Sequence, residues 1–203
     1  MSINFYVILL LSMENIKPRQ GKKETIWELA RFAIIAIIIV IPVRIFIAQP
    51  FIVSGSSMVP TFQNGDYLIV DEISYRLKNP ERFDVIVFRY PHDQTKFFIK
   101  RIIGLPNEEI VINNGIVTII NPEHPDGFIL DQPYVKNESK SNEHLKLKEN
   151  EYFVMGDNRS ASSDSRYWGA LTKNLIMGKA FIRLFPIKEI DLLPGYFQQI
   201  DNY

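Results

Sequence analysis

The 203-residue sequence contains no cysteine. This absence excludes disulfide bonds, thiolate nucleophiles, and zinc or iron–sulfur sites held by cysteine. Basic and acidic residues number 23 each, so the formal net charge is zero. Because a neutral chain has no global positive field, we expect no nucleic-acid partner. Hydrophobic residues make up 46% of the chain, which is enough for a packed core.

Histidine is also scarce, and its placement argues against catalysis by histidine. The three histidines, His92, His124 and His144, lie in polar, turn-rich stretches, where a solvated surface role is expected. The sequence lacks a G-x-S-x-G nucleophile elbow, and no serine is followed by lysine three positions later. Two common catalytic arrangements of serine hydrolases, a serine activated by histidine and the S-x-x-K motif, are therefore disfavoured.

One long apolar run lies near the N-terminus, at residues 29–49. Its centre is free of charge only between Arg31 and Arg44, whereas spanning a bilayer takes about 20 apolar residues. The run therefore spans only if both arginines extend toward opposite interfaces. We predict a retained transmembrane anchor. A cleaved signal peptide is the alternative, disfavoured because the run is long and no convincing small-x-small site follows it.

The charges beside this run predict its orientation. Four basic residues precede it, and no lysine or arginine lies between Arg44 and Arg76. The positive-inside rule places residues 1–28 in the cytoplasm and the bulk of the chain outside the plasma membrane. For residues 1–12 two alternatives stay open, an interfacial stretch or an upstream start with Met13 as the true initiator.

Beyond the apolar run, short β-branched and aromatic segments alternate with turn residues, including an Asn-Asn-Gly turn at residues 113–115. We predict a mainly antiparallel β catalytic domain from residues 50–120 and 151–187. The polar stretch 121–150 is expected to be an inserted loop or small lobe. Residues 188–203 form a C-terminal tail to which the sequence assigns no function.

Two short stretches carry candidate chemistry. "GSSMVPTF" places Ser56 and Ser57 just after the anchor, and "FFIKRIIG" places Lys100 in an apolar run. In a strand, Lys100 and Arg101 point to opposite faces, so we expect one of the two to be semi-buried. Burial lowers the pKa of a lysine, and a neutral amine can accept a serine proton. The stretch alone leaves open the alternative of two solvent-facing cations on an edge strand.

Three blocks in order resemble the bacterial type I signal peptidases: "SGSSMVPT" followed by "GD", "FIKRIIGLP", and "GDNRSASSDSRYWG". The likeness extends over residues 44–184 and lies behind an N-terminal anchor, as in the family. The resemblance implies that Ser57 is the nucleophile and Lys100 the general base, whereas Ser56 occupies a variable position. It implies an acyl-enzyme mechanism that needs no metal or organic cofactor.

The third block supplies residues that the resemblance places around the site. Ser162 matches the residue that orients the lysine amine, and Asp164 and Arg166 match a structural charged pair. The loop that shapes the site is matched by Gly156, Asp157, Asn158 and Arg159.

The resemblance also predicts an oxyanion hole. It uses the backbone N–H of Ser57, and some members add a hydroxyl two residues upstream, where this chain has Gly55. Removing such a donor typically costs about 2.7–4 kcal/mol of barrier, so a replacement is expected. Another backbone N–H, the hydroxyl of Ser54 and that of Ser56 all stay open.

The implied substrates are preproteins whose signal peptides bind in extended form along strand edges. Shallow pockets then select small residues at alternate positions. Candidate pocket residues are Phe51, Val53, Met58, Leu68, Val87, Phe98 and Ile99. We expect a monomer whose apolar surface at residues 50–53 and Met58 faces the lipid bilayer.

Two alternative functions follow from the same residues. A self-cleaving Ser/Lys peptidase of the SOS-repressor type shares the catalytic β fold, but the anchor and the lack of a basic helical N-terminal domain argue against it. A non-catalytic, membrane-anchored peptide-binding module would lack the set formed by Ser57, Lys100 and Ser162, which is intact here.

Overall fold

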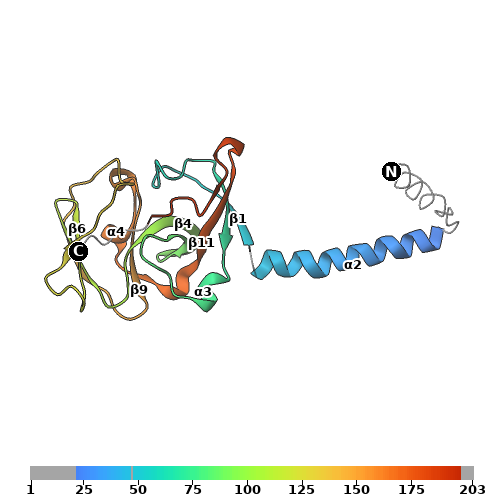
Figure 1. Cartoon of the computed structure of the whole chain (residues 1–203), viewed down its shortest axis with the longest axis horizontal. Coiled ribbons are helices and arrows are strands. Elements are labelled where there is room, and N and C mark those ends of the chain that lie inside the picture. Colours follow the sequence, from blue (N-terminus) through green and yellow to red (C-terminus); the bar gives the residue numbers. More distant parts are fainter. Residues whose placement is uncertain (1–21, 47, 198–203) are drawn as a thin grey trace, which may run out of the picture. The chain divides into compact units, whose positions relative to one another are not determined.

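The computed structural model describes residues 22–46 and 48–197, and the chain divides into two compact units between Val43 and Arg44. The long helix is α2 (Lys22–Phe46) (Figure 1). Most of its described side chains are exposed. Among the described residues, no helix is both long and apolar enough to cross a membrane. The predicted N-terminal segment and anchor fall partly outside the described residues, at positions 1–21 and 47.

The second unit is a β body of two antiparallel sheets, which confirms the predicted mainly antiparallel β domain (Figure 1). In the larger sheet the strand order is β1-β2-β11-β3-β4-β9-β10, and β12 pairs with β11. Its strands are β1 (Ala48–Ile52), β2 (Tyr67–Asp71), β3 (Val85–Tyr90), β4 (Asp93–Gly104), β9 (Glu151–Met155), β10 (Leu171–Thr172), β11 (Ile176–Phe185) and β12 (Asp191–Leu192).

The smaller sheet has the order β7-β6-β5-β8, and β6 lies at the opposite end of the β body from β1 (Figure 1). Its strands are β5 (Glu109–Asn113), β6 (Ile116–Ile120), β7 (Phe128–Ile129) and β8 (Glu143–Lys146). Asn114 and Gly115 form the predicted two-residue turn, with φ of 49° and 87°, the left-handed values that such hairpins require.

The predicted small lobe shares strand pairings with the hairpin that precedes it. Strand β5 pairs with β8 as well as with β6, so the hairpin at residues 109–120 belongs to the smaller sheet. The predicted division assigns this hairpin to the catalytic domain and residues 121–150 to the lobe, and it stays a prediction. The strand pattern alone could not separate the two sheets, because both are built from the same kind of β-branched segment.

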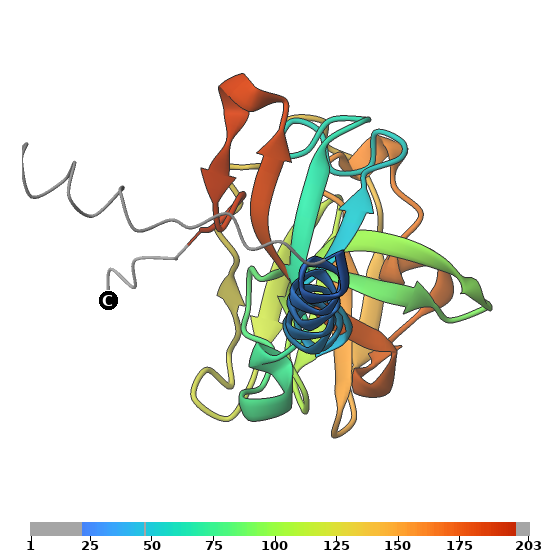
Figure 2. The same cartoon turned by 90° about the vertical axis from the view of Figure 1, so that its right-hand side faces the viewer.

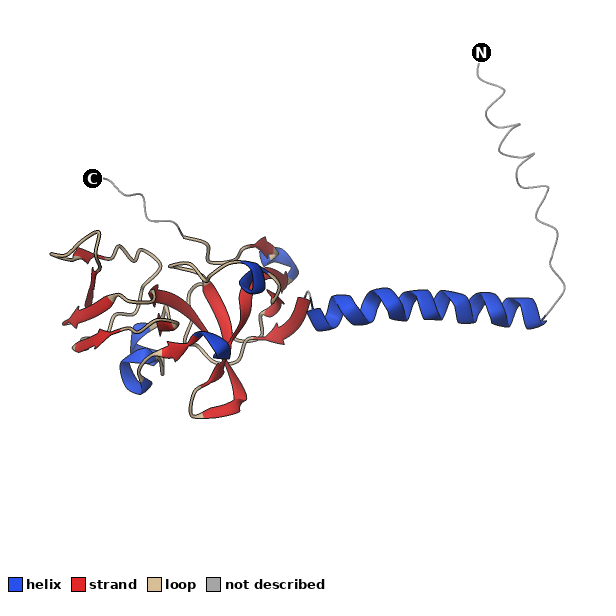
Figure 3. Cartoon of the chain, turned by 90° about the horizontal axis from the view of Figure 1, so that it is seen from below, coloured by secondary structure: helices blue, strands red, loops and turns tan. Residues whose placement is uncertain are grey.

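The remaining helices are single turns set between strands (Figure 3). They are α3 (Ser74–Leu77), η1 (Arg159–Ala161), α4 (Ser165–Trp168), η2 (Lys173–Leu175) and η3 (Ile187–Glu189). Element η3 joins β11 to β12, and these two strands form a hairpin that stands out from the larger sheet (Figure 2).

Three buried apolar clusters hold the β body together. One lies between the sheets and joins residues of the smaller sheet to Phe83, Phe153 and Met155. A second packs around β3 and β9, and a third, which contains Met58 and Phe62, lies beneath the segment that follows β1. Burial of such side chains stabilises a fold by about 25 cal/mol per Å² of apolar surface. The third cluster therefore anchors the segment that carries Ser57.

Candidate active site

Ser57 lies in a turn that leads from β1 toward β2. Gly55 in this turn has a φ of 95°, a left-handed conformation that favours glycine. Its N–H donates to Asn64 Oδ1 at 2.9 Å. The backbone conformation thus gives a reason why position 55 lacks a hydroxyl-bearing side chain.

The loop after β9 holds this turn in place. The N–H of Asn158 donates to the carbonyl oxygen of Ser57 at 3.0 Å, and its Nδ2 donates to that of Ser56 at 3.1 Å. A Cβ on Gly156 would overlap the Ser57 carbonyl oxygen and the Ser162 hydroxyl, so only glycine allows this close approach. Two segments far apart in the sequence are therefore in direct contact at Ser57.

Lys100 reaches the serine from strand β4. Its Nζ lies 2.7 Å from Ser57 Oγ, and it donates a second hydrogen bond to the Ile99 carbonyl oxygen at 2.9 Å. Only 4% of the residue is exposed. Burial lowers the pKa of Lys100 to about 8, and the carboxylates of Asp164 and Asp157 oppose this shift. A substantial fraction of the amine is therefore neutral in mildly alkaline solution and can accept a proton from the adjacent hydroxyl.

Arg101, the next residue on β4, is fully buried on the opposite face. One of these two cations was expected to be semi-buried, and the structure buries both, because both faces of β4 are covered. The serine turn covers the face of Lys100. On the other face, Arg101 donates to both carboxylate oxygens of Asp157, from Nε at 2.9 Å and from Nη2 at 2.6 Å. Its Nη1 donates to the Phe83 carbonyl oxygen at 3.0 Å.

Asp157 is itself completely buried and takes a third hydrogen bond, from Thr61 Oγ1 at 2.5 Å. Thr61 lies in the first sequence block, but no role was predicted for it. The sequence signal that could have pointed to Thr61 is its position directly after a turn-forming proline in "SGSSMVPT". The hydroxyl and the Arg101 guanidinium together satisfy the Asp157 carboxylate, as a buried charge requires.

The predicted charged pair is present as a buried ion pair. Arg166 donates to Asp164 from Nε at 2.8 Å and from Nη2 at 2.9 Å. Asp164 Oδ2 also accepts the N–H of Gly156 at 3.1 Å, and Arg166 Nη2 donates to the Arg159 carbonyl oxygen at 2.7 Å. The pair therefore supports the loop at residues 156–159 from behind.

Arg159 occupies the end of this loop. It is buried, and its Nε donates to the Gly156 carbonyl oxygen at 3.0 Å, while its Nη2 donates to Gln132 Oε1 in the small lobe. Burial lowers the pKa of the Arg159 guanidinium, and Tyr134 opposes that shift. The bond to Gln132 links the site loop to the small lobe.

Ser162 is buried next to Gly156, with 5% of the residue exposed. Its hydroxyl makes no hydrogen bond within the described part of the chain. The predicted contact with the Lys100 amine is thus not formed here, and the orienting role of Ser162 stays a prediction.

A groove runs along the serine and the lysine. Six of the seven predicted pocket residues line it: Phe51, Val53, Leu68, Val87, Phe98 and Ile99. Met58 does not, because its side chain is 1% exposed and packs in the cluster beneath the turn. Phe97, Ala161 and Ser163 also line the groove and were not among the predicted pocket residues. The Phe97 ring meets that of Phe51 edge to face at 5.4 Å.

The fold and the site together fit a serine peptidase, and comparisons with known proteins specify which. The model of the family described as signal peptidase, peptidase S26, matches residues 26–185. The chain is 38% identical over 189 residues to "Probable signal peptidase I-2" of Synechocystis sp., a match that covers 89% of this chain and 83% of the relative. It is 36% identical over 160 residues to "Probable signal peptidase I-1" of the same organism, which covers 75% and 79%.

A third relative is "Signal peptidase I S" of Bacillus subtilis, 33% identical over 183 residues that cover 84% of this chain and 95% of the relative. The chain therefore belongs to the signal peptidase I enzymes of the S26 family, the serine peptidases that remove signal peptides. This membership decides against both alternatives, the self-cleaving peptidase and the non-catalytic peptide-binding module.

Proposed function

We propose that Ser57 is the nucleophile of this signal peptidase and that Lys100 is its general base. The observation that carries the proposal is the 2.7 Å separation of Lys100 Nζ and Ser57 Oγ at a buried position. A serine hydroxyl is a weak nucleophile until a base takes its proton, and an amine with a pKa of about 8 suits that task.

The reaction then proceeds in two halves. As Ser57 Oγ attacks the scissile carbonyl carbon, its proton moves to Lys100 Nζ, which passes it to the departing amine as the peptide bond breaks. The product of this half is an acyl-enzyme. Lys100 next takes a proton from a water molecule that attacks the ester, and the returning proton restores the Ser57 hydroxyl.

The other site residues support this reaction. The backbone N–H of Ser57 stabilises the oxyanion, and the second donor stays open among another backbone N–H and the hydroxyls of Ser54 and Ser56, which both line the groove. Ser162 orients the Lys100 amine once that amine is neutral. No metal or organic cofactor takes part.

The substrate binds as an added strand. Strand β9 pairs with β4 only from Arg101 onward, so residues 93–100 have β3 as their one partner among the described strands. The open edge of this half of β4 borders the groove, and residues 51–57 line it too. An extended peptide can use such an edge for main-chain hydrogen bonds, while alternate side chains enter the pockets.

We further propose that the predicted span 29–49 anchors the enzyme in the plasma membrane through its helical part, which ends at Phe46, because Ala48 and Gln49 pair with β2. Residues 1–28 then lie in the cytoplasm and the β body outside. The flanking charges support this orientation. Ile52 and Phe97, at the groove, are 67% and 41% exposed and suit contact with a lipid bilayer. Met58 is buried and takes no part in that surface. We propose that the enzyme acts as a monomer.

Cleavage of a purified preprotein in detergent tests the two catalytic roles. Ser57→Ala and Lys100→Met abolish cleavage, and so does Lys100→Arg, because a guanidinium stays protonated. Ser56→Ala, the change at the neighbouring hydroxyl, retains most of the activity. Cleavage by purified Ser57→Ala would overturn the proposal.

The absence of cysteine makes the topology directly testable. A single cysteine at Asn174, which is exposed on the β body, should react with a membrane-impermeant maleimide on intact cells. A single cysteine at Glu24 should react only after the cells are opened. Labelling of both positions, or of the Glu24 position alone, on intact cells would contradict the proposed orientation.

A further inference from the structure

Residues 193–197, Leu-Pro-Gly-Tyr-Phe, form a short segment that we term the tail clasp. It follows β12, and the N–H of Leu193 donates to the Phe181 carbonyl oxygen at 2.7 Å. Leu193 and Gly195 both have left-handed backbones, with φ of 54° and 75°. This tight turn directs the chain back onto the β body, on the side of β4 away from the groove.

The tail clasp contacts Arg101. The Gly195 carbonyl oxygen accepts a hydrogen bond from Arg101 Nη1 at 2.6 Å. Nη1 also donates to the Phe83 carbonyl oxygen, and Nε and Nη2 donate to the Asp157 carboxylate. A buried guanidinium needs partners for its N–H groups, and an unsatisfied one is costly. Gly195 therefore accepts one of the four hydrogen bonds that hold a guanidinium which solvent does not reach.

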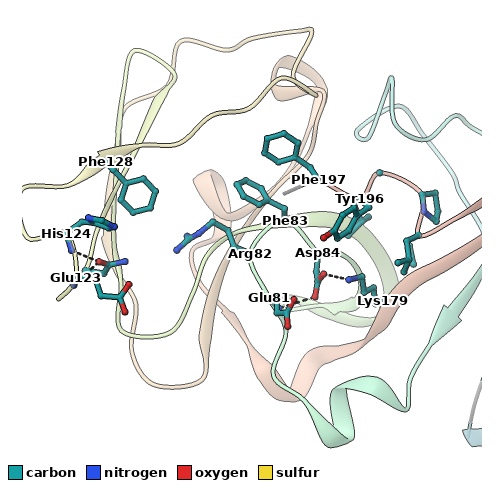
Figure 4. A pocket seen from close by; sticks show the side chains of 16 residues that line it. Glu81, Arg82, Phe83, Asp84, Glu123, His124, Phe128, Lys179, Tyr196 and Phe197 are labelled. Carbon is teal, nitrogen blue, oxygen red and sulfur yellow. Dashed lines mark hydrogen bonds and ion pairs between the residues drawn. The ribbon is translucent and has the colours of Figure 1, made fainter. Parts of the chain in front are cut away.

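Aromatic side chains close the same region. The Phe197 ring lies 4.9 Å from that of Phe83 and 5.5 Å from that of Tyr134, both at edge-to-face angles. The guanidinium carbon of Arg101 lies 4.0 Å from the centre of the Tyr134 ring. Figure 4 shows Phe197 and Phe83 side by side in the pocket that the tail clasp borders. The tail clasp therefore contacts Arg101 and also lines this pocket.

We propose that the tail clasp is a positioning element for the serine–lysine site, and that it acts through Arg101 and Asp157. Asp157 is connected to the serine through the next residue, Asn158, whose N–H donates a hydrogen bond to the Ser57 carbonyl oxygen. The inference rests on the proposed function, in which Lys100 is the base.

The charges around the lysine predict how the clasp acts. Asp164 and Asp157 are the carboxylates that raise the basicity of Lys100. Arg166 neutralises the first and Arg101 the second. Arg159 and Tyr134 also feel the charge of Asp157. When Arg101 loses Gly195, its hold on Asp157 loosens, the Asp157 charge is less neutralised, and the amine keeps its proton to higher pH.

Gly195→Ala tests the proposal in the full-length enzyme. A Cβ at this position would lie 2.5 Å from Thr61 Cγ2 and 3.2 Å from Arg101 Nη2, so the carbonyl must shift. We expect the inflection of kcat/KM against pH to move up by about one unit, which lowers kcat/KM at pH 7 about tenfold and leaves it unchanged well above the inflection. KM for the preprotein should not change, because the groove lies on the other face of β4.

Gly169→Ala is the matched control. Gly169 also has a positive φ, 83°, which costs an L-residue strain, but nothing lies within 4 Å of an added Cβ. Gly169→Ala therefore strains a positive-φ position without touching Arg101, so its pH profile should match that of the wild type. A second pair of variants removes residues 193–203 or only residues 198–203, and only the first should shift the profile.

The outcomes separate the inference from the proposed function. A folded Gly195→Ala enzyme with the wild-type inflection and rate overturns the inference, and so does a loss of the same factor at every pH. A wild-type profile without an inflection near 8, or an active Lys100→Met enzyme, would instead overturn the role of Lys100.

Discussion

The main-chain N–H of Asn158 donates a hydrogen bond to the carbonyl oxygen of Ser57, with an N···O distance of 3.0 Å. This bond joins the first and third sequence blocks at the serine itself. The loop at residues 156–159 is therefore part of the device that fixes the serine turn against β4. A displacement of that loop should move Ser57 Oγ away from the amine, and misplacement by about 1 Å can cost about 100-fold in rate.

Gly156→Ala should lower preprotein cleavage by at least about 100-fold. The added Cβ would overlap the Ser57 carbonyl oxygen, so the serine turn must move. Cleavage rate per folded molecule, with the folded fraction measured by circular dichroism, checks this prediction.

Gly178→Ala is the control for Gly156→Ala, because a Cβ there would overlap the Asp71 carbonyl oxygen between β11 and β2. It should lower the unfolding temperature while each folded molecule keeps nearly normal activity. Equal activity losses in the two variants would show that the clash at Gly156 acts only through stability.

The activity should rise with pH through an inflection near 8, the pKa to which burial lowers Lys100. Below the inflection the amine is protonated and cannot accept the Ser57 proton, so kcat/KM should fall about tenfold per pH unit. The measurement is kcat/KM for a preprotein in detergent between pH 6 and pH 10. An unchanged rate across that range would contradict the assignment of Lys100 as the titrating base.

The same shift makes Lys100 a destabilising residue at neutral pH. Its pKa falls from 10.5 to about 8 on folding, so between these values the unfolded state binds more protons and stability rises with pH. The loss of stability caused by burying the Lys100 amine is full below pH 8 and disappears above pH 10.5. Lys100→Met should therefore raise the free energy of unfolding at pH 7, by up to about 3 kcal/mol.

Denaturant unfolding followed by Trp168 fluorescence measures this difference. Because the chain has two tryptophans, both proteins carry Trp27→Phe so that the signal comes from the β body alone. The advantage of Lys100→Met should shrink as the pH rises from 8 to 10.5. An advantage that stays constant with pH would show that packing, and not the charge of Lys100, is its cause.

Ser162→Ala should reduce cleavage by about 10- to 100-fold, the range of a lost orienting group, without lowering stability. Its hydroxyl is buried and makes no hydrogen bond among the described residues, so its removal costs nothing in the resting fold. Preprotein cleavage and the unfolding temperature are the two readouts.

Ser165→Ala is the matched variant for Ser162→Ala. Its hydroxyl accepts the N–H of Val154 at 3.0 Å, so the alanine should lower stability by about 1–3 kcal/mol and leave the rate per folded molecule nearly normal. If Ser162→Ala cleaved as fast as the wild type, the orienting role would be wrong.

Val87→Ala should relax the preference for small residues at the cleavage site. Val87 is a buried side chain that lines the groove. Shortening this side chain deepens a pocket. The ratio of kcat/KM for a preprotein with valine before the scissile bond to kcat/KM for the same preprotein with alanine there should therefore rise about tenfold in the variant. Val85→Ala, two residues earlier on β3, removes a core side chain away from the groove and should leave this ratio unchanged. A ratio unaffected by Val87→Ala would remove Val87 from the specificity pocket.

The order of the blocks, the β character of the body and the hairpin at Asn114 and Gly115 could all be predicted from local sequence. The alternation of apolar and polar residues, the turn residues and the short motifs each depend only on residues that are close in the sequence. They can therefore be recognised without knowledge of the fold. The family followed from the same blocks. The pairing of Ser57 with Lys100 could be proposed from the resemblance, but its distance could not be derived.

Tertiary structure alone decided which side chains are covered. Lys100 and Arg101 are both buried, and Met58 packs in the core, because the serine turn, the small lobe and the tail clasp pack around β4. Burial depends on segments that meet only after folding, and alternation along one strand does not reveal what lies above each face. For the same reason, the contact between Gly195 and Arg101 has no signature in the sequence of the tail.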